Sequence, residues 1–131
     1  WGHALESATN FLIPHGIAIS MGMMASVEFS NSNFESDLLW LHCKTIVLKA
    51  IDITKISNFQ KDKFENAFNS DKKHTKENYV LIIPSKNSVS KLGVEEIKIK
   101  KNSKNLSKIV ASMIKTISII KIEINDFVRK K

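Results

Sequence analysis

The sequence predicts a mainly helical protein with a short two-stranded β element at about residues 79–83 and 94–100. Three observations lead to this fold class. Apolar residues recur at helical spacing over most of the chain, the 131 residues include only 2 prolines and 4 glycines, and a strand pattern replaces the helical one near residue 79. The chain is long enough for one compact domain with its own core. We therefore expect residues 1–131 to form a single helical domain.

The first two helices are expected on either side of a proline. Residues 2–9 have the pattern of the end of a helix, and Asn10 to Pro14 breaks it, because proline restricts the residue before it to extended conformations. The next helix is expected from about His15 to Phe29. Its small residues let neighbouring backbones approach closely, which indicates a helix buried in a bundle; they are Gly16, Ala18, Gly22 and Ala25.

Two more helices are expected before the strands. A polar break from Asn31 to Ser36 offers N-cap residues for a helix from about Ser36 to Ile51. Its apolar face is expected to hold Leu39, Cys43, Ile46, Val47 and Ala50. A further helix is expected from about Asn58 to Asn69, with one face formed by Phe59, Lys63, Phe64, Ala67 and Phe68.

The strands and the last helix have distinct patterns. Tyr79 to Ile83 is a continuous apolar run ended by Pro84, which indicates a buried strand. Residues 94–100 end in alternating apolar and charged residues, which predicts a half-exposed strand that could pair with the first. Ser103 or Asn105 is expected to cap the last helix. Its apolar stripe packs either on this domain or on a partner domain or subunit; the stripe is Leu106, Ile109, Val110, Met113, Ile117, Ile120, Ile124 and Val128.

The net charge of +7 is unevenly distributed. Residues 1–85 carry 8 basic and 9 acidic residues, whereas residues 86–131 carry 12 and 4. A basic segment can attract phosphates or nucleic acid. Phe127 is the only aromatic residue among these lysines, so we interpret the segment as a solvated basic face and expect no nucleic-acid partner. No apolar run approaches about 18 residues and no secretory signal is visible, so no membrane partner and a cytoplasmic location are expected.

The single cysteine, Cys43, cannot form an internal disulfide, which suits a reducing compartment. A thiol nucleophile is one interpretation of this residue. A small apolar side chain buried in a helix is the interpretation that we favour.

Three short segments contain the residue types that could carry chemistry: GHALE at residues 2–6, PHG at 14–16 and DKK at 71–73. His3 and His15 are twelve residues apart across the proline break, so their imidazoles could face one cleft and bind zinc or transfer protons. Two histidines are too few for a zinc site, and each could instead bond a nearby carbonyl. The lysines of DKK could hold a phosphate or carboxylate, or could belong to an ordinary charged loop.

Three features in order along the chain resemble the metal-binding region of the 3-dehydroquinate synthase family, in the sugar phosphate cyclase superfamily. They are GHALES, the histidine twelve residues after His3, and the helix AISMGMMAS. In that family a GHAxE segment is followed by a leucine-histidine-glycine-glutamate turn and an AxxxGM helix. A DKK segment precedes a hydrophobic strand at a similar distance. The resemblance covers about residues 1–100.

The resemblance implies the helical C-terminal domain of a larger two-domain enzyme, whose N-terminal NAD-binding domain is absent from this chain. Because the chain opens on Trp1, we expect it to start inside that larger protein. The family are lyases of the shikimate pathway, which makes aromatic amino acids. They oxidise a substrate hydroxyl transiently, eliminate phosphate, reduce the ketone again and close a carbocycle. The implied cofactors are NAD and a divalent metal, zinc or cobalt. The implied partners are a phosphorylated sugar-acid substrate, the N-terminal domain and a second copy in a homodimer.

Residue by residue, His15 matches a metal-binding histidine of the family, whose other histidine and glutamate ligands belong before Trp1. His3 matches the catalytic histidine that contacts the substrate and assists proton transfer around the phosphate. Lys72 or Lys73 matches the lysine that holds the phosphonate or carboxylate end of the substrate. No residue of this chain is implied in binding NAD.

The chain departs from the family pattern at three places. Ile17 stands where a glutamate usually follows His-Gly, Pro14 replaces leucine, and the tail after about residue 101 matches nothing. These differences leave open a related sugar-phosphate cyclase of secondary metabolism. Another alternative is an iron- or zinc-type alcohol or polyol-phosphate dehydrogenase. A PHG turn also occurs in iron-type alcohol dehydrogenases, although GHALES and DKK argue against that branch. The non-enzymatic alternative is a helical interaction module whose basic tail binds an acidic partner.

Overall fold

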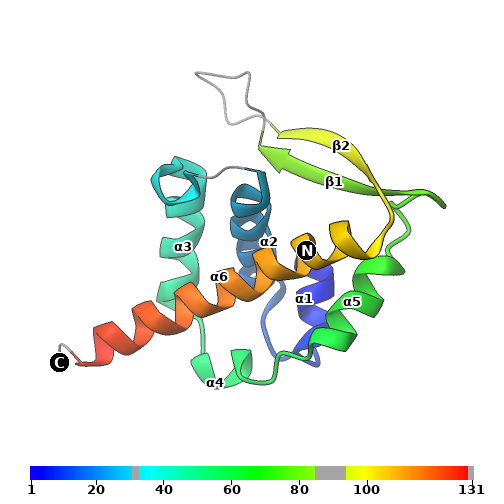
Figure 1. Cartoon of the computed structure of the whole chain (residues 1–131). Coiled ribbons are helices and arrows are strands. Elements are labelled where there is room, and N and C mark those ends of the chain that lie inside the picture. Colours follow the sequence, from blue (N-terminus) through cyan, green and yellow to red (C-terminus); the bar gives the residue numbers. More distant parts are fainter. Residues whose placement is uncertain (31–32, 85–93, 130–131) are drawn as a thin grey trace.

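The computed structural model of the chain describes residues 1–30, 33–84 and 94–129. The predicted fold class is confirmed: helices form most of the molecule, and two strands form a small antiparallel sheet at one side (Figure 1). The elements are α1 (Gly2–Ala8), α2 (His15–Ser30), the 3-10 helix η1 (Phe34–Ser36), α3 (Leu38–Ala50), α4 (Ile53–Ile56), α5 (Lys61–Asn69), β1 (Asn78–Pro84), β2 (Val94–Lys100) and α6 (Ser103–Arg129).

Helix α2 lies at the centre of the molecule and packs against α1, α3, α6 and β1 (Figure 1). A helix with apolar or small residues on every side is stable only when neighbours surround it. This confirms the prediction of a helix buried in a bundle. The buried residues of α2 are Ile17, Ala18, Met21, Gly22, Met24, Ala25, Ser26 and Val27.

Two glycines allow the backbones of α1 and α2 to touch. A Cβ atom added at Gly22 would lie 2.7 Å from the backbone nitrogen of Gly2 and 3.1 Å from its Cα. A Cβ atom added at Gly2 would lie 2.7 Å from Cδ1 of Ile19 and 3.2 Å from its Cα. Only residues without a side chain fit this crossing, and it holds the first turn of α1, including His3, against α2.

We expect Gly22→Ala to destabilise the chain by about 1–3 kcal/mol, because the added methyl meets backbone that cannot move aside without shifting α1. Gly16→Ala is the matched control in the same helix, since a Cβ atom there has nothing within 4 Å. The control should be neutral or more stable by up to about 1 kcal/mol, because alanine favours helices more than glycine does. Urea unfolding of both variants measures the difference, and equal midpoints would contradict the close crossing.

Helix α3 begins two residues later than expected and turns a different face inward. The Asp37 carboxylate caps it by accepting hydrogen bonds from the N–H groups of Leu39 (2.9 Å) and Trp40 (3.2 Å). The inward residues are Trp40, Cys43 and Val47, whereas Ile46 is 41% exposed and Ala50 is exposed. The predicted face was therefore wrong at Ile46 and Ala50.

Burial of Trp40 explains the rotation of α3. Its ring packs edge-on against Phe34 at 5.3 Å between centroids, which brings Trp40 inward in place of Ile46. The interpretation of Cys43 as a small buried residue is confirmed, because it is 3% exposed. Burial also raises the pKa of its thiol, which disfavours the reactive thiolate.

The segment between α3 and β1 contains one turn of helix that the sequence did not predict. Helix α4 is capped by Asp52, whose carboxylate accepts from the backbone N–H of Thr54 (3.0 Å) and from its hydroxyl (2.7 Å). Helix α5 begins three residues after the predicted start and buries Phe64 and Phe68 on the side that packs against α1.

The two strands pair in antiparallel register, with Leu81 opposite Ile97 and Asn78 opposite Lys100. Strand β1 is buried at most apolar positions, although Ile82 is 43% exposed. In β2, half-buried isoleucines alternate with exposed charged residues, as predicted.

The long helix α6 crosses α2 and packs on it, so the apolar stripe of the tail covers this chain's own core (Figure 1). Five of the stripe residues are buried: Ile109, Val110, Met113, Ile117 and Ile120. The predicted cap was wrong, because the side chain of Asn102 accepts the hydrogen bond from the N–H of Asn105 at 2.7 Å. The Trp1 indole donates to the Ile109 carbonyl (3.1 Å) and the Ser112 hydroxyl (3.0 Å), which ties the start of α1 to α6.

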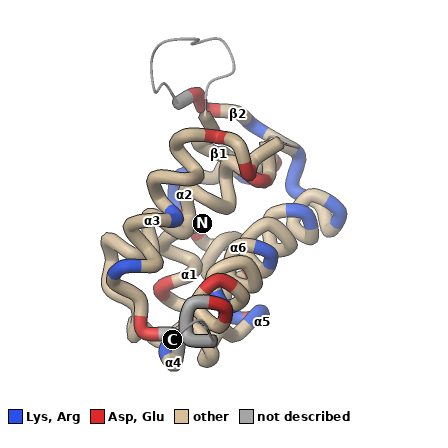
Figure 2. The backbone as a smooth tube through the Cα atoms, turned by 90° about the vertical axis from the view of Figure 1, so that its left-hand side faces the viewer, with Lys and Arg blue, Asp and Glu red and all other residues tan. Residues whose placement is uncertain are grey.

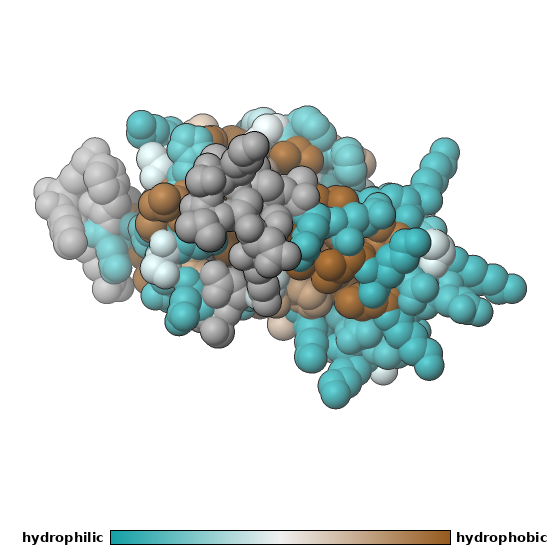
Figure 3. All heavy atoms as spheres, turned by 90° about the horizontal axis from the view of Figure 1, so that it is seen from above, coloured by the Kyte–Doolittle hydropathy of each residue, from teal (hydrophilic) through white to brown (hydrophobic). Residues whose placement is uncertain are grey.

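Lysines follow β2 and the adjoining start of α6 along the outside of the molecule (Figure 2). Seen from above, the surface is largely hydrophilic, with hydrophobic patches between the polar side chains (Figure 3). These views agree with the interpretation of the basic segment as a solvated face. Among the described helices, none is both long and apolar enough to cross a lipid bilayer.

Candidate functional site

The turn between α1 and α2 brings the start of α2 back beside α1. Two successive residues in this turn have positive φ angles, Asn10 at 54° and Phe11 at 60°. Asparagine tolerates this conformation, whereas for a bulky residue such as phenylalanine it is unusual and strained. The Phe11 N–H donates to the backbone carbonyl of Glu6 at 2.8 Å, which closes the turn over α1. Backbone strain of this kind is concentrated at functional sites, so the turn is consistent with one here.

Three side chains from α1 and α2 form a cluster. Nδ1 of His15 is hydrogen-bonded to Oε1 of Glu6, and Nδ1 of His3 lies 3.6 Å from Oε2 of the same carboxylate. The two imidazole rings lie 5.6 Å apart between centroids and are inclined by 33°. Potential metal-binding atoms of all three side chains lie within 4.8 Å of one another. The structure thus brings His3 and His15 together, and the hydrogen bond of His15 goes to a carboxylate rather than to a nearby carbonyl.

The cluster has a buried base and an open top. The Glu6 side chain is 12% exposed, whereas those of His3 and His15 are 69% and 65% exposed. A ligand can therefore reach both imidazoles from solvent, while the carboxylate lies beneath them.

Glu6 is the residue of this site that the sequence interpretation missed, since only the histidine of GHALE was expected to take part in the site. One signal was available, because residues three apart in a helix lie on the same face, which places Glu6 beside His3. Its contact with His15 had no local signal, because the strained turn creates it.

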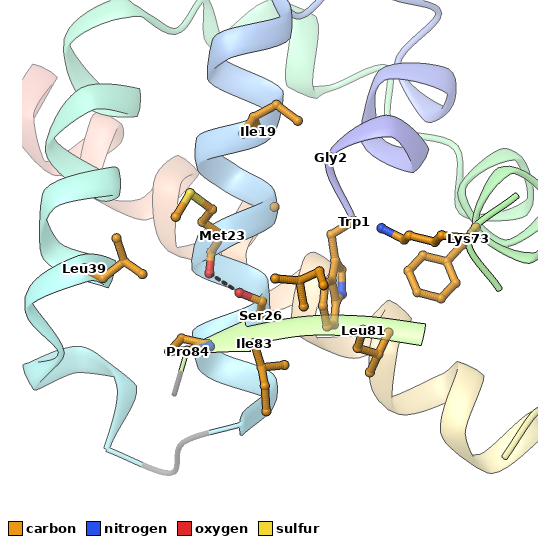
Figure 4. Close-up of a pocket in the computed structure, with 13 residues that line it drawn as sticks. Trp1, Gly2, Ile19, Met23, Ser26, Leu39, Lys73, Leu81, Ile83 and Pro84 are labelled. Carbon is orange, nitrogen blue, oxygen red and sulfur yellow. Dashed lines mark hydrogen bonds between the residues drawn. The ribbon is translucent and has the colours of Figure 1, made fainter. Parts of the chain in front are cut away.

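A pocket of about 270 Å³ lies between the start of α1, helices α2 and α3, and β1 (Figure 4). Its lining is mainly apolar, and Lys73 is the only charged side chain among the described residues that line it. Figure 4 shows the Lys73 side chain extending toward Trp1. Gly2 lines the pocket and His3 follows it directly, so the pocket and the histidine cluster meet at the first turn of α1.

Asp71 holds the loop that carries the two lysines. Its carboxylate accepts from the Lys73 N–H at 3.1 Å and lies 3.9 Å from the Lys73 ammonium. Burial alone would raise the pKa of Asp71, but this hydrogen bond and the charges of Lys73 and His74 outweigh burial and lower it. Asp71 therefore stays ionised and fixes Lys73.

The predicted convergence of the lysines with the histidines is only partial. Among the described residues, no hydrogen bond or ion pair joins Lys72 or Lys73 to His3 or His15. Both lysines are exposed, but Lys73 lines the pocket beside α1 and Lys72 does not.

The residues present fit a divalent metal in part. Imidazole nitrogen is a good zinc ligand, and because Glu6 engages Nδ1 of His15, Nε2 of that ring is left as a possible donor. A zinc site needs at least three protein ligands, so further ligands have to join His15.

The chain is thus a small helical domain in which a histidine pair lies over a carboxylate beside a pocket with one lysine. These are residue types that metal and proton chemistry use. The sequence profile described as 3-dehydroquinate synthase C-terminal matches residues 1–74, which is more than half of the chain. The chain belongs to the 3-dehydroquinate synthase C-terminal family.

Curated relatives agree with this membership. A protein named 3-dehydroquinate synthase from Saccharolobus solfataricus is 37% identical over 90 residues, covering 63% of this chain and 24% of the relative. Another of that name, from Sulfurisphaera tokodaii, is 36% identical over 74 residues, covering 41% of this chain and 21% of the relative. The chain thus spans about a quarter or less of the length of these relatives. No solved structure shows significant similarity to the chain.

Proposed function

We propose that this chain is the C-terminal, substrate- and metal-binding part of a 3-dehydroquinate synthase-like cyclase. Such an enzyme is a carbon–oxygen lyase that eliminates phosphate from a seven-carbon sugar-acid phosphate, here as a step of the shikimate pathway in the cytoplasm. The observation that carries the proposal is the meeting of His3 and His15 over the Glu6 carboxylate. Family membership over residues 1–74 supports it.

The complete enzyme of this proposal has further parts. An N-terminal domain binds NAD, two ligands from outside this chain complete the metal site with His15, and two copies form a homodimer. When bound, zinc or cobalt would supply a Lewis acid for a substrate hydroxyl, and NAD would supply a reversible hydride acceptor.

Each named residue of this chain has a task in the proposal. His15 binds the metal through Nε2. His3, which is exposed and lies beside the Glu6 carboxylate, accepts or donates the proton that moves with the leaving phosphate. Oxygen Oε2 of Glu6, 3.6 Å from Nδ1 of His3, stabilises the charge that His3 gains when it takes a proton.

The lysine of the proposal is Lys73, because it lines the pocket beside Gly2 and Lys72 does not, although both side chains are exposed. Its ammonium is a compact positive charge that can hold the anionic end of the substrate. The pocket walls are mainly apolar while the Lys73 side chain is 42% exposed, so part of that interaction is shielded from water and thereby strengthened.

The test uses the full-length protein that carries this chain, supplied with NAD, zinc and a seven-carbon sugar-acid phosphate. We expect inorganic phosphate to be released without net formation of NADH, because the hydride is returned within each turnover. Phosphate and the absorbance of NADH are measured together. Steady NADH production would identify a dehydrogenase instead. If neither product forms and the protein binds neither NAD nor zinc, the proposal is wrong.

A further inference from the structure

We propose that Glu6 is the positioning residue of this site: its carboxylate fixes which nitrogen of His15 carries the proton and keeps the His3 imidazole beside it. The part of this inference that concerns the metal rests on the proposed function. The part that concerns the two imidazoles rests on the geometry of this chain alone.

The tautomer follows from the hydrogen bond. An ionised carboxylate can only accept, so the contact between Oε1 of Glu6 and Nδ1 of His15 requires the proton to be on Nδ1. In a neutral imidazole the other nitrogen then has a free lone pair, and Nε2 is ready to bind a metal. Histidine ligands in metalloproteins commonly donate their second N–H to a carboxylate, which fixes the orientation of the ring.

The same contact argues that Glu6 is not itself a ligand of the metal that His15 binds. Nδ1 of His15 and Oε1 of Glu6 are in direct hydrogen-bond contact, so no ion fits between these two atoms. The proximity of the three side chains within 4.8 Å therefore agrees with a carboxylate that holds the two rings, and not with an ion shared between Nδ1 of His15 and Oε1 of Glu6.

Glu6 is well placed to hold both rings because it is the fixed member of the cluster. Its side chain is 12% exposed, while the rings are about two-thirds exposed. Its backbone carbonyl accepts from the Phe11 N–H (2.8 Å) and the Thr9 N–H (3.3 Å), so the turn anchors it. Its second oxygen, Oε2, faces Nδ1 of His3. One anchored carboxylate thus supports a histidine from α1 and a histidine from α2.

The test is nitrogen NMR of the histidine rings in the 131-residue chain at about pH 8.5, where ordinary imidazoles are neutral. The chain has two internal references. Nδ1 of His74 accepts the Val80 N–H at 2.9 Å, so His74 carries its proton on Nε2, the opposite tautomer to that expected for His15. His42 is exposed on α3 and represents a free ring.

We expect His15 to show a protonated Nδ1 in the unchanged chain and to approach the pattern of His42 in Glu6→Ala. Glu6→Gln keeps an acceptor oxygen and should largely restore the protonated Nδ1. Glu65→Ala is the matched control, because Glu65 is a helical glutamate whose surface partner is Lys61 at 3.9 Å, and it should leave His15 unchanged. The inference is overturned if His15 in the unchanged chain resembles His74, a result that needs no variant to fold.

A second measurement separates this inference from the proposed function. In the full-length protein, Glu6→Ala should lower zinc affinity by about 10–100-fold, the usual effect of losing a carboxylate that orients a ligand, and Glu6→Gln by less. If the tautomer depends on Glu6 while the full-length protein releases no phosphate, the positioning role stands and the proposed function fails. If phosphate is released but Glu6→Ala changes neither tautomer nor zinc affinity, the positioning role fails and the proposed function stands.

Discussion

Replacing His15 by alanine is expected to lower the zinc affinity of the full-length protein by at least about 100-fold. Losing a group that only orients a ligand costs about 10–100-fold, so losing the ligand itself should cost more. The exposed ring of His15 is hydrogen-bonded through Nδ1 to the Glu6 carboxylate, which leaves Nε2 as the nitrogen that could bind a metal. Under the proposed function, phosphate release should fall in parallel, because the metal would polarise the substrate hydroxyl.

Zinc content after dialysis against chelators of graded strength measures this loss independently of activity. His42→Ala is the matched control, since His42 is an exposed histidine on α3 outside the cluster, and it should keep its zinc. If His15→Ala retains zinc as well as the His42 variant does, His15 is not a ligand. The site would then have to be sought among residues outside this chain.

Much of the fold could be predicted from the sequence because local patterns determine it. The small-residue helix at α2, the apolar run at β1 and the long amphipathic stripe of α6 each carry a period that is visible without tertiary information. The predictions failed at two places, for different reasons. Packing of Trp40 against Phe34 decided which face of α3 is buried, and the single turn of α4 was too short to produce a period.

The candidate site could likewise be predicted from the sequence only in part. The twelve-residue spacing of His3 and His15 across a proline break indicated that the two rings could meet, and they do. The role of Glu6 depended on positive φ angles at Asn10 and Phe11, and the residue types of this turn gave no reason to expect two successive left-handed residues. The position of Lys73 near Trp1 likewise depends on how the loop after α5 folds back toward the start of α1 (Figure 4).

As an isolated polypeptide, the 131-residue chain is expected to lose stability as the pH is lowered from about 8 to about 5, because its free Trp1 amino group is buried. In a longer protein Trp1 would carry a peptide bond at this position, so the prediction concerns the isolated chain alone. Burial and the nearby charge of Lys73 lower the pKa of this amine from 8.0 to about 5, although Asp71 acts in the opposite direction. In the unfolded chain the amine binds a proton below about pH 8, whereas in the folded chain it does so only below about pH 5. Between these values the unfolded state binds more protons, so the free energy of unfolding rises with pH.

A difference of about three pKa units corresponds to up to about 4 kcal/mol, the largest single effect that we expect in this chain. Urea unfolding across this pH range should be compared with that of the N-acetylated chain, in which an uncharged amide replaces the amine and this contribution disappears. Lys73→Gln should weaken this pH dependence of the unfolding free energy, because it removes the Lys73 charge that helps to lower the pKa of the amine. If the free and acetylated chains respond equally to pH, the amine is solvated in the folded state. The pocket that Trp1 and Lys73 line would then be wet, and an anionic substrate would gain less there from the Lys73 charge.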